Sequence, residues 1–333
     1  MKSQQIVLTS RPTGAPTSSN FKMKFTEIGP IDDGEFLVKN SWMSVDPYMR
    51  GRMKSADSYV PAFQIDEPLE GGCIGEVIES RNKDFSKGDT VLGSLGWREY
   101  WKSNGDGVTP IDPNLAPIQA FLGVLGMTGL TAWVGLNRIA SLQSGSTVFV
   151  SAASGAVGSI VVQLAKAKDC RVIGSAGKAE KIEWLKQKTG IDKVINYKET
   201  SDLVGELAEN APDGIDVYFD NVGGDHLEAA LDVINDFGCC VECGMISTYN
   251  ATEPIPAPRN LFQVIGKRIR MQGFIVRDHL DAKDEFVREM TKLIKADKVV
   301  WKESITEGLE NAPAAFIGLF DGDNLGKQLV RIS

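Results

Sequence analysis

The sequence predicts an α/β protein in which a doubly wound parallel sheet domain is joined to a separate, irregular β domain. Apolar β-branched runs alternate with helix-like segments from about residue 126 to 298, which is the pattern of a parallel sheet built from strand–helix units. Residues 1–125 instead hold short strand-like runs between turns rich in Gly, Pro and Asp. The chain of 333 residues is long enough for two domains. We expect residues 299–333, which end in another strand-like run, to close back on the first domain.

The predicted elements follow from hydrophobic periodicity. In the irregular β domain and its C-terminal return, we expect strands over 35–39, 75–79, 90–93 and 327–332. In the parallel sheet domain, we expect strands over 147–150, 171–176, 193–196, 215–220, 238–243 and 270–275. Helices are expected over 129–139, after the turn 151–156, and over 179–188, 200–209 and 224–234.

The turn after the 147–150 strand carries a degenerate glycine motif. It reads Ala153-x-Gly155-x-x-Gly158, which is Gly-x-Gly-x-x-Gly with its first glycine replaced by alanine. In that pattern the second glycine lets the backbone approach a pyrophosphate, the third lets the helix pack on its strand, and the helix N-terminus attracts the phosphates. A degenerate match is also compatible with a tight strand–helix turn that binds nothing.

The end of the next strand bears on which dinucleotide would bind. An NAD-binding fold usually carries an Asp or Glu there for the ribose 2′-hydroxyl, but the chain has no acid at the tip of the 171–176 strand and has Lys178 and Lys181 just beyond it. A lysine there could neutralise a 2′-phosphate, which favours NADP(H). Both lysines could instead be solvated at a helix start, although cations are unfavourable at that end of a helix.

Polar and glycine residues gather where the later strands end. Asn196-Tyr197, residues 220–224 and residues 243–250 follow three predicted strands, and ligands of open α/β sheets bind beyond such carboxyl ends. Among these residues Tyr249 offers a hydroxyl suited to acid–base work. Any one of these segments could be turn chemistry alone. Aromatic stretches over 42–50 and 58–61 either fill a core or line a cleft as an apolar wall with hydroxyl groups.

Composition excludes several function classes. With 42% hydrophobic and 24% charged residues, the chain is an ordinary globular one, and its net charge of −8 argues against nucleic acid or anionic membranes as partners. We find no membrane span and no apolar leader, so a cytoplasmic location is expected. The five cysteines include Cys240-x-x-Cys243 on a predicted strand, where a structural role is favoured over redox or metal chemistry. With only two histidines, no metal site is expected.

Six ordered motifs carry a resemblance over nearly the whole chain. They are Val45-Asp-Pro-Tyr-Met-Arg50, Gly126-Met-Thr-Gly-Leu-Thr-Ala-Trp133, Ala152-Ala-Ser-Gly-Ala-Val-Gly158, Tyr218-Phe-Asp-Asn-Val-Gly-Gly224, Gly244-Met-Ile-Ser-Thr-Tyr-Asn250 and Gly322-Asp-Asn-Leu-Gly-Lys327. With them the chain resembles the zinc-independent medium-chain dehydrogenase/reductases, in the branch of leukotriene/prostaglandin reductases, plant double-bond reductases and curcumin reductases. The resemblance implies a GroES-like catalytic domain over 1–125 and 299–333, a Rossmann domain over 126–298, NADPH as cofactor, and a homodimer.

The resemblance also implies roles for particular residues. Substrate would be lined by Tyr48, Tyr59 and Tyr249, with Tyr249 as the catalytic hydrogen-bond donor. The residues implied to contact the cofactor are Ala153, Ser154, Gly155, Ala156, Val157, Lys178, Lys181, Tyr197, Asn221, Cys243, Gly244, Ile246, Ser247, Tyr249, Phe274, Ile275, Val276 and Asn324.

The function implied is reduction of the C=C bond of α,β-unsaturated ketones and aldehydes, with curcumin or prostaglandin-like compounds as candidate substrates. Hydride would reach the β-carbon while a tyrosine hydroxyl stabilises the enolate oxygen. Two other functions stay open: a quinone reductase of the same superfamily, and an NADPH-binding sensor or structural protein without catalysis.

Overall fold

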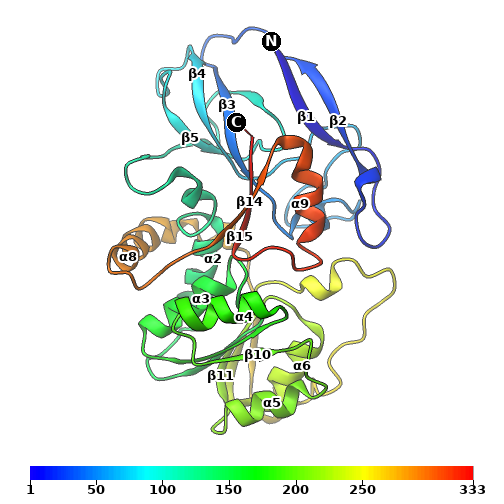
Figure 1. Ribbon diagram of the computed structural model, residues 1–333, viewed down its shortest axis with the longest axis vertical. Coiled ribbons are helices and arrows are strands. Elements are labelled where there is room, and N and C mark those ends of the chain that lie inside the picture. Colours follow the sequence, from blue (N-terminus) through cyan, green and yellow to red (C-terminus); the bar gives the residue numbers. More distant parts are fainter. Residues whose placement is uncertain (333) are drawn as a thin grey trace. The chain divides into compact units, whose positions relative to one another are not determined.

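The computed structural model describes residues 1–332, and these fall into two compact units (Figure 1). Unit 1 consists of Met1–Gly123 together with the C-terminal segment from Glu303, and unit 2 consists of Val124–Lys302. No helix in the described part of the chain is both long and apolar enough to cross a membrane.

Unit 2 is built around a six-stranded parallel sheet with the strand order β10-β9-β8-β11-β12-β13. In chain order this is 3-2-1-4-5-6, the arrangement of a doubly wound dinucleotide-binding sheet. Its strands are β8 (Thr147–Val150), β9 (Arg171–Ala176), β10 (Lys193–Asn196), β11 (Ile215–Asp220), β12 (Ile234–Glu242) and β13 (Arg270–Gly273).

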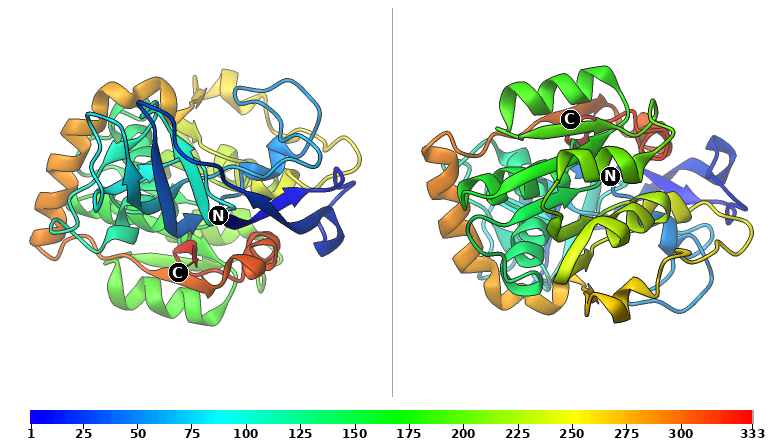
Figure 2. Two further views of the ribbon diagram at one scale, coloured as in Figure 1. Left: turned by 90° about the horizontal axis from the view of Figure 1, so that it is seen from above. Right: turned by 90° about the horizontal axis from the view of Figure 1, so that it is seen from below.

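Helices lie on both faces of this sheet (Figure 2). Those of unit 2 are α2 (Met127–Val134), which continues as a π-helical turn η3 (Gly135–Ile139), α3 (Gly158–Ala167), α4 (Ala179–Lys188), α5 (Leu203–Asn210), α6 (Gly224–Val233), η4 (Ile246–Thr248), α7 (Gln263–Gly266), η5 (Val276–Ala282) and α8 (Lys283–Lys295). The buried side chains of α5 and α6 join Phe149, Ile173 and Tyr218 in one apolar core, so these two helices cover the face to which those side chains point.

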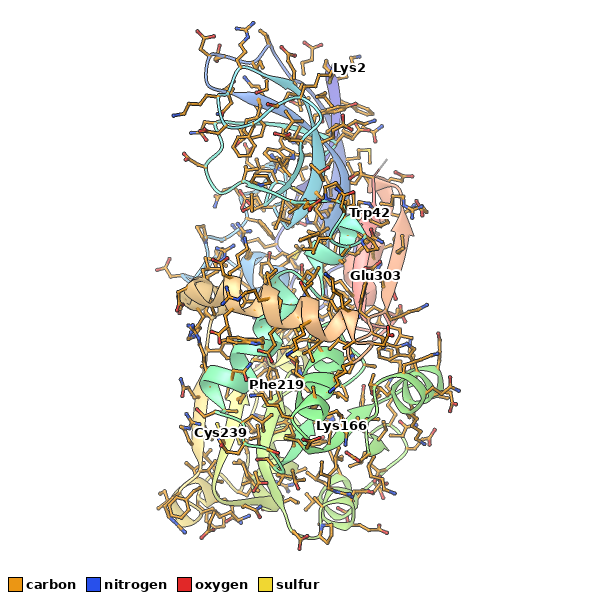
Figure 3. The ribbon with its side chains drawn as sticks, turned by 90° about the vertical axis from the view of Figure 1, so that its left-hand side faces the viewer. Lys2, Trp42, Lys166, Phe219, Cys239 and Glu303 are labelled. Carbon is orange, nitrogen blue, oxygen red and sulfur yellow. The ribbon has the colours of Figure 1, made fainter. Side chains whose placement is uncertain are left out.

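The opposite face of the sheet is covered by the segment that contains α2 and α3. Phe219 and Cys239, labelled on adjacent strands in Figure 3, point to this face. The Phe219 ring lies against Gly135, and the Cys239 sulfur lies 4.0 Å from the Ile139 carbonyl oxygen. Because the central strands of this parallel sheet are buried on both faces, β8 is apolar and β11 is buried over most of its length.

Unit 1 combines a two-stranded sheet with a seven-stranded sheet. The first pairs β1 (Lys2–Leu8) with β2 (Phe21–Glu27), and the second has the order β14-β15-β3-β4-β5-β7, with β6 also paired to β3. Its strands are β3 (Phe36–Ser44), β4 (Cys73–Ser80), β5 (Thr90–Gly93), β6 (Tyr100–Ser103), β7 (Thr109–Pro110), β14 (Glu303–Glu307) and β15 (Lys327–Arg331). Its short helices are η1 (Ser18–Asn20), α1 (Met49–Arg52), η2 (Ile118–Leu122), η6 (Leu309–Asn311) and α9 (Ala312–Gly318).

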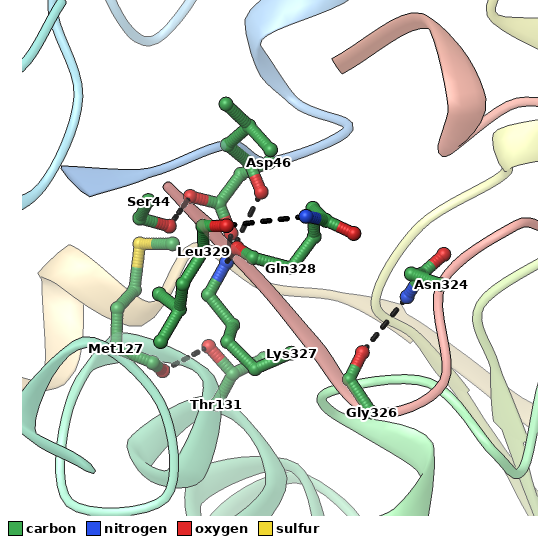
Figure 4. A network of polar contacts seen from close by, with 10 residues as sticks. Ser44, Asp46, Met127, Thr131, Asn324, Gly326, Lys327, Gln328 and Leu329 are labelled. Carbon is green, nitrogen blue, oxygen red and sulfur yellow. Dashed lines mark hydrogen bonds and ion pairs between the residues drawn. The ribbon is translucent and has the colours of Figure 1, made fainter. Parts of the chain in front are cut away.

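A buried ion pair fastens the C-terminal segment into unit 1 (Figure 4). Lys327, at the start of β15, places its ammonium group 2.9 Å from a carboxylate oxygen of Asp46 and 3.1 Å from the Val45 carbonyl oxygen. The Asp46 carboxylate also accepts a hydrogen bond from the Ser44 hydroxyl. β15 pairs with β3, so the strand ladder and the ion pair together close the sheet.

The structure departs from the sequence-based expectations mainly at the ends of elements. The helix expected over 224–234 ends at Val233, because Ile234 already begins β12, and the strand expected over 270–275 ends at Gly273. The helix expected over 129–139 starts at Met127 and changes to π geometry at Gly135. The β1–β2 hairpin and helix α8 had not been expected.

Candidate active site

The turn between β8 and α3 is held open by small residues. Its backbone closes through a hydrogen bond from Gly155 N–H to the Ala152 carbonyl oxygen, 2.9 Å long, and Ala152 itself has a positive φ of 47°. A Cβ atom at Gly158 would lie 2.4 Å from the Ala152 carbonyl oxygen, which no real side chain tolerates. Glycine at position 158 is therefore what lets α3 start directly against the turn.

Among the described residues, no side chain caps the N-terminus of α3. Its first turn contains no acidic residue, and Val157 at the N-cap makes no capping hydrogen bond. The N-terminal N–H groups of a helix attract anions, and the small residues Ala153–Val157 leave the backbone accessible to a phosphate. The same turn is tied to β9 by a hydrogen bond of 2.9 Å from Ala153 N–H to the Ser175 carbonyl oxygen.

The ends of β9 and β10 bring basic and aromatic residues next to one another. Lys178 is the N-cap residue of α4, and Lys181 follows in its first turn. Tyr197 follows β10, whose last residue Asn196 pairs with Ala176 at the end of β9. The Tyr197 ring lies so close to the chain that a Cβ atom at Gly177 would lie 2.9 Å from it. Lys178, Lys181 and Tyr197 are therefore collected at one edge of the sheet.

The ends of β11 and β12 form a second group, the β11–β12 rim, which we define as residues 220–224 and 243–249. The Asp220 carbonyl oxygen accepts hydrogen bonds from the N–H groups of Cys243 and Gly244, each 3.0 Å long. The amide of Asn221 donates from Nδ2 to the Ser151 carbonyl oxygen at 2.8 Å. Further along, Ile246 N–H reaches the Asn221 carbonyl oxygen at 3.3 Å, and Ser247 N–H reaches that of Val222 at 3.2 Å. The two halves of the rim are thus bonded to each other through the backbone.

Tyr249 is the residue of the rim with an acid–base-capable hydroxyl group. It follows the single turn η4, and its side chain folds back so that the Met245 N–H donates to its hydroxyl oxygen over 3.4 Å. A Cβ atom at position 244 would lie 3.1 Å from that hydroxyl, so Gly244 leaves room for the tyrosine to approach the backbone. The side chain is half-buried.

The remaining predicted residues lie in two places. Phe274, Ile275 and Val276 follow β13 in unit 2 and are half-buried, with the Phe274 ring 6.3 Å from that of His279. Tyr48, Tyr59 and Asn324 belong to unit 1. Tyr48 packs against the core of unit 1, Tyr59 is 58% exposed, and Asn324 donates to the Gly326 carbonyl oxygen at 2.8 Å.

Ionisation of the cysteines near the rim is disfavoured. All five cysteines are free thiols, and burial raises the pKa of Cys240 and raises that of Cys243 to about 12. A thiol that stays protonated is a poor nucleophile and a poor metal ligand. Within residues 1–332, no three His, Cys, Asp or Glu side chains come together in a way that could hold a metal ion.

Sequence reasoning had missed Ser151, whose role depends on the tertiary structure. Its hydroxyl accepts from Asn221 N–H at 2.9 Å and lies 3.2 Å from Asp220 Oδ1. The two residues are far apart in sequence and meet because β8 and β11 are neighbours in the sheet. A serine directly after a buried strand was the available signal, since such positions face the ligand edge of a parallel sheet.

The fold, the strand order and the open turn before α3 define a domain of the dinucleotide-binding type, and the comparisons place the chain among the oxidoreductases. Residues 4–111 match a family model described as an N-terminal domain of oxidoreductase, and residues 156–296 match one described as a zinc-binding dehydrogenase. The chain belongs to the medium-chain dehydrogenase/reductases, in the branch of alkenal, curcumin and prostaglandin reductases.

Three relatives illustrate this membership. The chain is 43% identical to the NADP⁺-dependent 2-alkenal reductase of Nicotiana tabacum, over 100% of this chain and 98% of the relative. It is 41% identical to the NADPH-dependent curcumin reductase of Escherichia coli strain K12, over 100% and 97%. Among solved structures, CurA from Vibrio vulnificus in complex with NADPH is 41% identical, with a TM-score of 0.95 over 99% of both chains.

Proposed function

We propose that the protein uses NADPH to reduce the C=C bond of α,β-unsaturated ketones and aldehydes. The observation that carries this proposal is the uncapped turn before α3 with a lysine pair at the end of the adjacent strand β9. The proposal is supported by the reductases of the same branch, among them the tobacco alkenal reductase and the E. coli curcumin reductase.

The residues of unit 2 fit NADPH along one edge of the sheet. Ala153, Ser154, Gly155, Ala156 and Val157 would hold the pyrophosphate, because the turn is small and α3 carries no acid or side-chain cap there. Lys181, with Lys178 and the Tyr197 hydroxyl, would bind the 2′-phosphate. Six residues of the β11–β12 rim would flank the nicotinamide and its ribose, together with Phe274, Ile275, Val276 and, from unit 1, Asn324. The six are Asn221, Cys243, Gly244, Ile246, Ser247 and Tyr249.

When bound, NADPH would supply the hydride to the β-carbon of the substrate, and a proton from water or a tyrosine would complete the reduction at the α-carbon. As negative charge develops on the carbonyl oxygen, a positioned hydrogen-bond donor lowers the barrier. Tyr249 is the proposed donor, since its side chain is anchored over the backbone of the rim by the Met245 N–H. Tyr48 and Tyr59 are the proposed substrate contacts from unit 1.

The activity is tested by following oxidation of reduced nicotinamide with a long-chain alkenal, with curcumin and with a simple quinone, using NADPH and NADH in parallel. We expect turnover of the enones with NADPH and much slower turnover with NADH. Turnover of the quinone alone would instead indicate a quinone reductase. NADPH binding without turnover of any substrate would indicate a non-catalytic NADPH-binding protein.

The donor role is tested with Tyr249→Phe, which removes the hydroxyl and keeps the ring. Loss of one such donor lowers kcat by roughly a hundredfold, so we expect that decrease with little change in KM. Tyr100→Phe, on β6 of unit 1, is the matched control and should behave like the wild type. An unchanged kcat in Tyr249→Phe would exclude this tyrosine as the donor.

A cytoplasmic homodimer completes the proposal. It rests on the family resemblance and on the acidic net charge of −8, which is unfavourable for binding to anionic membranes. Light scattering on the purified protein would give a mass of twice the chain if the proposal is right, and the mass of a single chain if it is wrong.

A further inference from the structure

A cluster of buried polar side chains lies at the carboxyl ends of three neighbouring strands. Asp220 ends β11, Glu242 ends β12, and the two are paired in the sheet register, so their side chains point to the same face. Tyr218 lies two residues before Asp220 on that face, and Ser151 follows β8. The mechanism proposed above uses none of these four side chains.

One oxygen of Asp220 has several hydrogen-bond donors. Asp220 Oδ1 accepts from the Tyr218 hydroxyl at 2.7 Å, from the Ser151 hydroxyl at 3.2 Å, and from the N–H groups of Val222 and Gly223 at 2.8 Å each. Asp220 Oδ1 is therefore saturated with donors, and the charge of Asp220 acts on the neighbouring Glu242.

The other carboxyl oxygens of the cluster face one another without a donor. Asp220 Oδ2 and both carboxyl oxygens of Glu242 are buried, and within residues 1–332 no hydroxyl or N–H group donates to them. Two buried carboxylates placed side by side repel each other, and one of them keeps its proton. If Glu242 holds that proton, it donates a hydrogen bond to Asp220, and two of the three buried oxygens gain a partner.

Within residues 1–332, the titratable groups recorded as interacting with the pair carry no positive charge. Those that face it are the Tyr218 hydroxyl on β11, the thiols of Cys240 and Cys243 on and after β12, and His226 on α6. Burial lowers the pKa of His226, so its imidazole is neutral as well. Burial and the negative charge of Asp220 raise the pKa of Glu242 to about 8, and the hydrogen bond between the two carboxyl groups acts in the same direction.

Asp220 connects this pair to the β11–β12 rim. Its side chain fixes the N–H groups of Val222 and Gly223, and its backbone oxygen accepts from Cys243 and Gly244. A displacement of Asp220 therefore moves both halves of the rim, which carry Asn221 and Tyr249. A second negative charge on Glu242 would produce such a displacement.

We propose that Glu242 is a positioning residue for the cofactor rim: its neutral carboxyl group donates a hydrogen bond to Asp220 and so keeps the 220–224 turn bonded to the 243–244 backbone. Ionisation of Glu242 places two negative charges on adjacent strands and opens the rim. The role toward NADPH rests on the proposed function, whereas the protonation of the pair does not.

The first test compares the stability of wild type and Glu242→Gln without cofactor between pH 5 and 9.5. The folded chain keeps the Glu242 proton at pH values where the unfolded chain has lost it, because the pKa is raised from 4.5 to about 8 on folding. The free energy of unfolding of the wild type must then fall as pH rises through this window. The variant carries a neutral amide that can still donate to Asp220. We expect its melting temperature to exceed that of the wild type by a margin that grows up to about pH 8 and then stays constant.

The second test measures the dissociation constant of NADPH by fluorescence titration over the same pH range. If only the protonated form of Glu242 holds the rim, about a tenth of the wild type is competent one unit above the pKa, so affinity falls about tenfold. Glu242→Gln should keep its affinity. Glu242→Leu, which is neutral but cannot donate, should bind NADPH more weakly than Glu242→Gln at every pH. Glu209→Gln, an exposed position on α5, is the matched control and should follow the wild type.

Each outcome decides one step. A stability difference between wild type and Glu242→Gln that does not change with pH would contradict the proposal that the Glu242 carboxyl group is neutral in the folded protein. A pH-dependent stability difference with equal NADPH affinities in all variants would overturn the positioning role. Failure of the wild type to bind NADPH at any pH would overturn the proposed function and the role toward NADPH with it, while the stability comparison would still decide the protonation of Glu242.

Discussion

Two strand–turn–helix segments of unit 2 have the same architecture but differ in whether acidic side chains lie at the helix N-terminus. β8 leads into α3 through the turn 151–157, and β11 leads into α6 through the turn 221–223. The α3 turn has no acidic residue in the first helical turn and no side-chain cap. In the α6 turn, the Asp220 carboxylate accepts from the N–H groups of Val222 and Gly223, and Asp225 adds a second acid.

This difference indicates which turn is available to an anionic ligand. A helix N-terminus attracts negative charge, and the chain supplies that charge itself at α6 but not at α3. A phosphate is therefore expected at the α3 turn and excluded by Asp220 from the α6 turn. The α6 turn instead supports the rim, because the N–H groups of Asn221, Val222 and Gly223 are already bonded within the protein.

The largest expected effect comes from closing the α3 turn with Gly158→Ala. The added Cβ atom would lie 2.4 Å from the Ala152 carbonyl oxygen and 2.9 Å from Ala153 Cα, both backbone atoms. We expect a loss of about 3 kcal/mol in the free energy of unfolding and loss of NADPH binding. Denaturant unfolding and a fluorescence titration with NADPH measure the two effects.

Gly266→Ala is the control for this substitution. Position 266 is also in unit 2, and nothing lies within 4 Å of its Cβ position. Its effect should stay within about 0.5 kcal/mol. Equal behaviour of the two variants would contradict the steric account of the α3 turn.

An intermediate effect is expected when the charge in the α6 turn is removed with Asp220→Asn. The N–H groups of Val222 and Gly223 would lose an ionised acceptor, which is worth about 2 kcal/mol. The negative charge beside Glu242 also disappears, so the pKa of Glu242 falls in the variant. The variant therefore loses less stability at high pH than the wild type does. The deficit of the variant should therefore be largest near pH 6 and shrink toward pH 9, as measured by chemical unfolding at each pH.

Asp216→Asn gives the comparison for this prediction. Asp216 lies on the same strand, where its carboxylate accepts from Thr147 N–H and from Asn235 Nδ2 at 2.8 Å each. Glu242 is paired in the sheet register with Asp220 and not with Asp216, so the deficit of Asp216→Asn should be constant between pH 6 and 9. A deficit of Asp220→Asn that is also constant over this range would mean that the two carboxyl groups do not interact.

The smallest effect is expected from Lys181→Ala. This substitution tests the second proposed phosphate site, the one for the 2′-phosphate. Loss of one charge-assisted contact to the 2′-phosphate should weaken NADPH binding about tenfold and leave NADH binding unchanged. Lys186→Ala, near the other end of α4, should leave both affinities unchanged. If Lys181→Ala weakened NADH as much as NADPH, the lysine would not be a 2′-phosphate ligand.

Sequence periodicity located four strands of the parallel sheet because each is a short run with apolar residues at its centre, bounded by turns. β8, β9, β10 and β11 have the bounds that were predicted. The β1–β2 hairpin was missed, since Ser3 is buried and the polar residues of β1 interrupt the alternation. Helix α8 was left unassigned because it buries only Phe286 and Met290 among many charged residues.

The candidate site was predictable only where its residues are contiguous in sequence with the strands that present them. Ala153–Val157 and the two lysines are contiguous with the strands that present them, so local patterns indicated them. The Ser151–Asp220–Glu242 cluster depends on the register between β8, β11 and β12, and nothing in the linear sequence fixes that register. A glutamate among cysteines and valines on β12 gave no sign that it would lie beside a second buried carboxyl group.

The central claim is that the protein delivers hydride to the β-carbon of an enone, and isotope transfer tests it most directly. The full-length protein is incubated with an enone and NADPH that carries deuterium at the transferring position of the nicotinamide, and the product is examined by NMR. We expect a saturated ketone with one deuterium on the β-carbon. Deuterium on the carbonyl carbon of an allylic alcohol, with the C=C bond intact, would contradict the account.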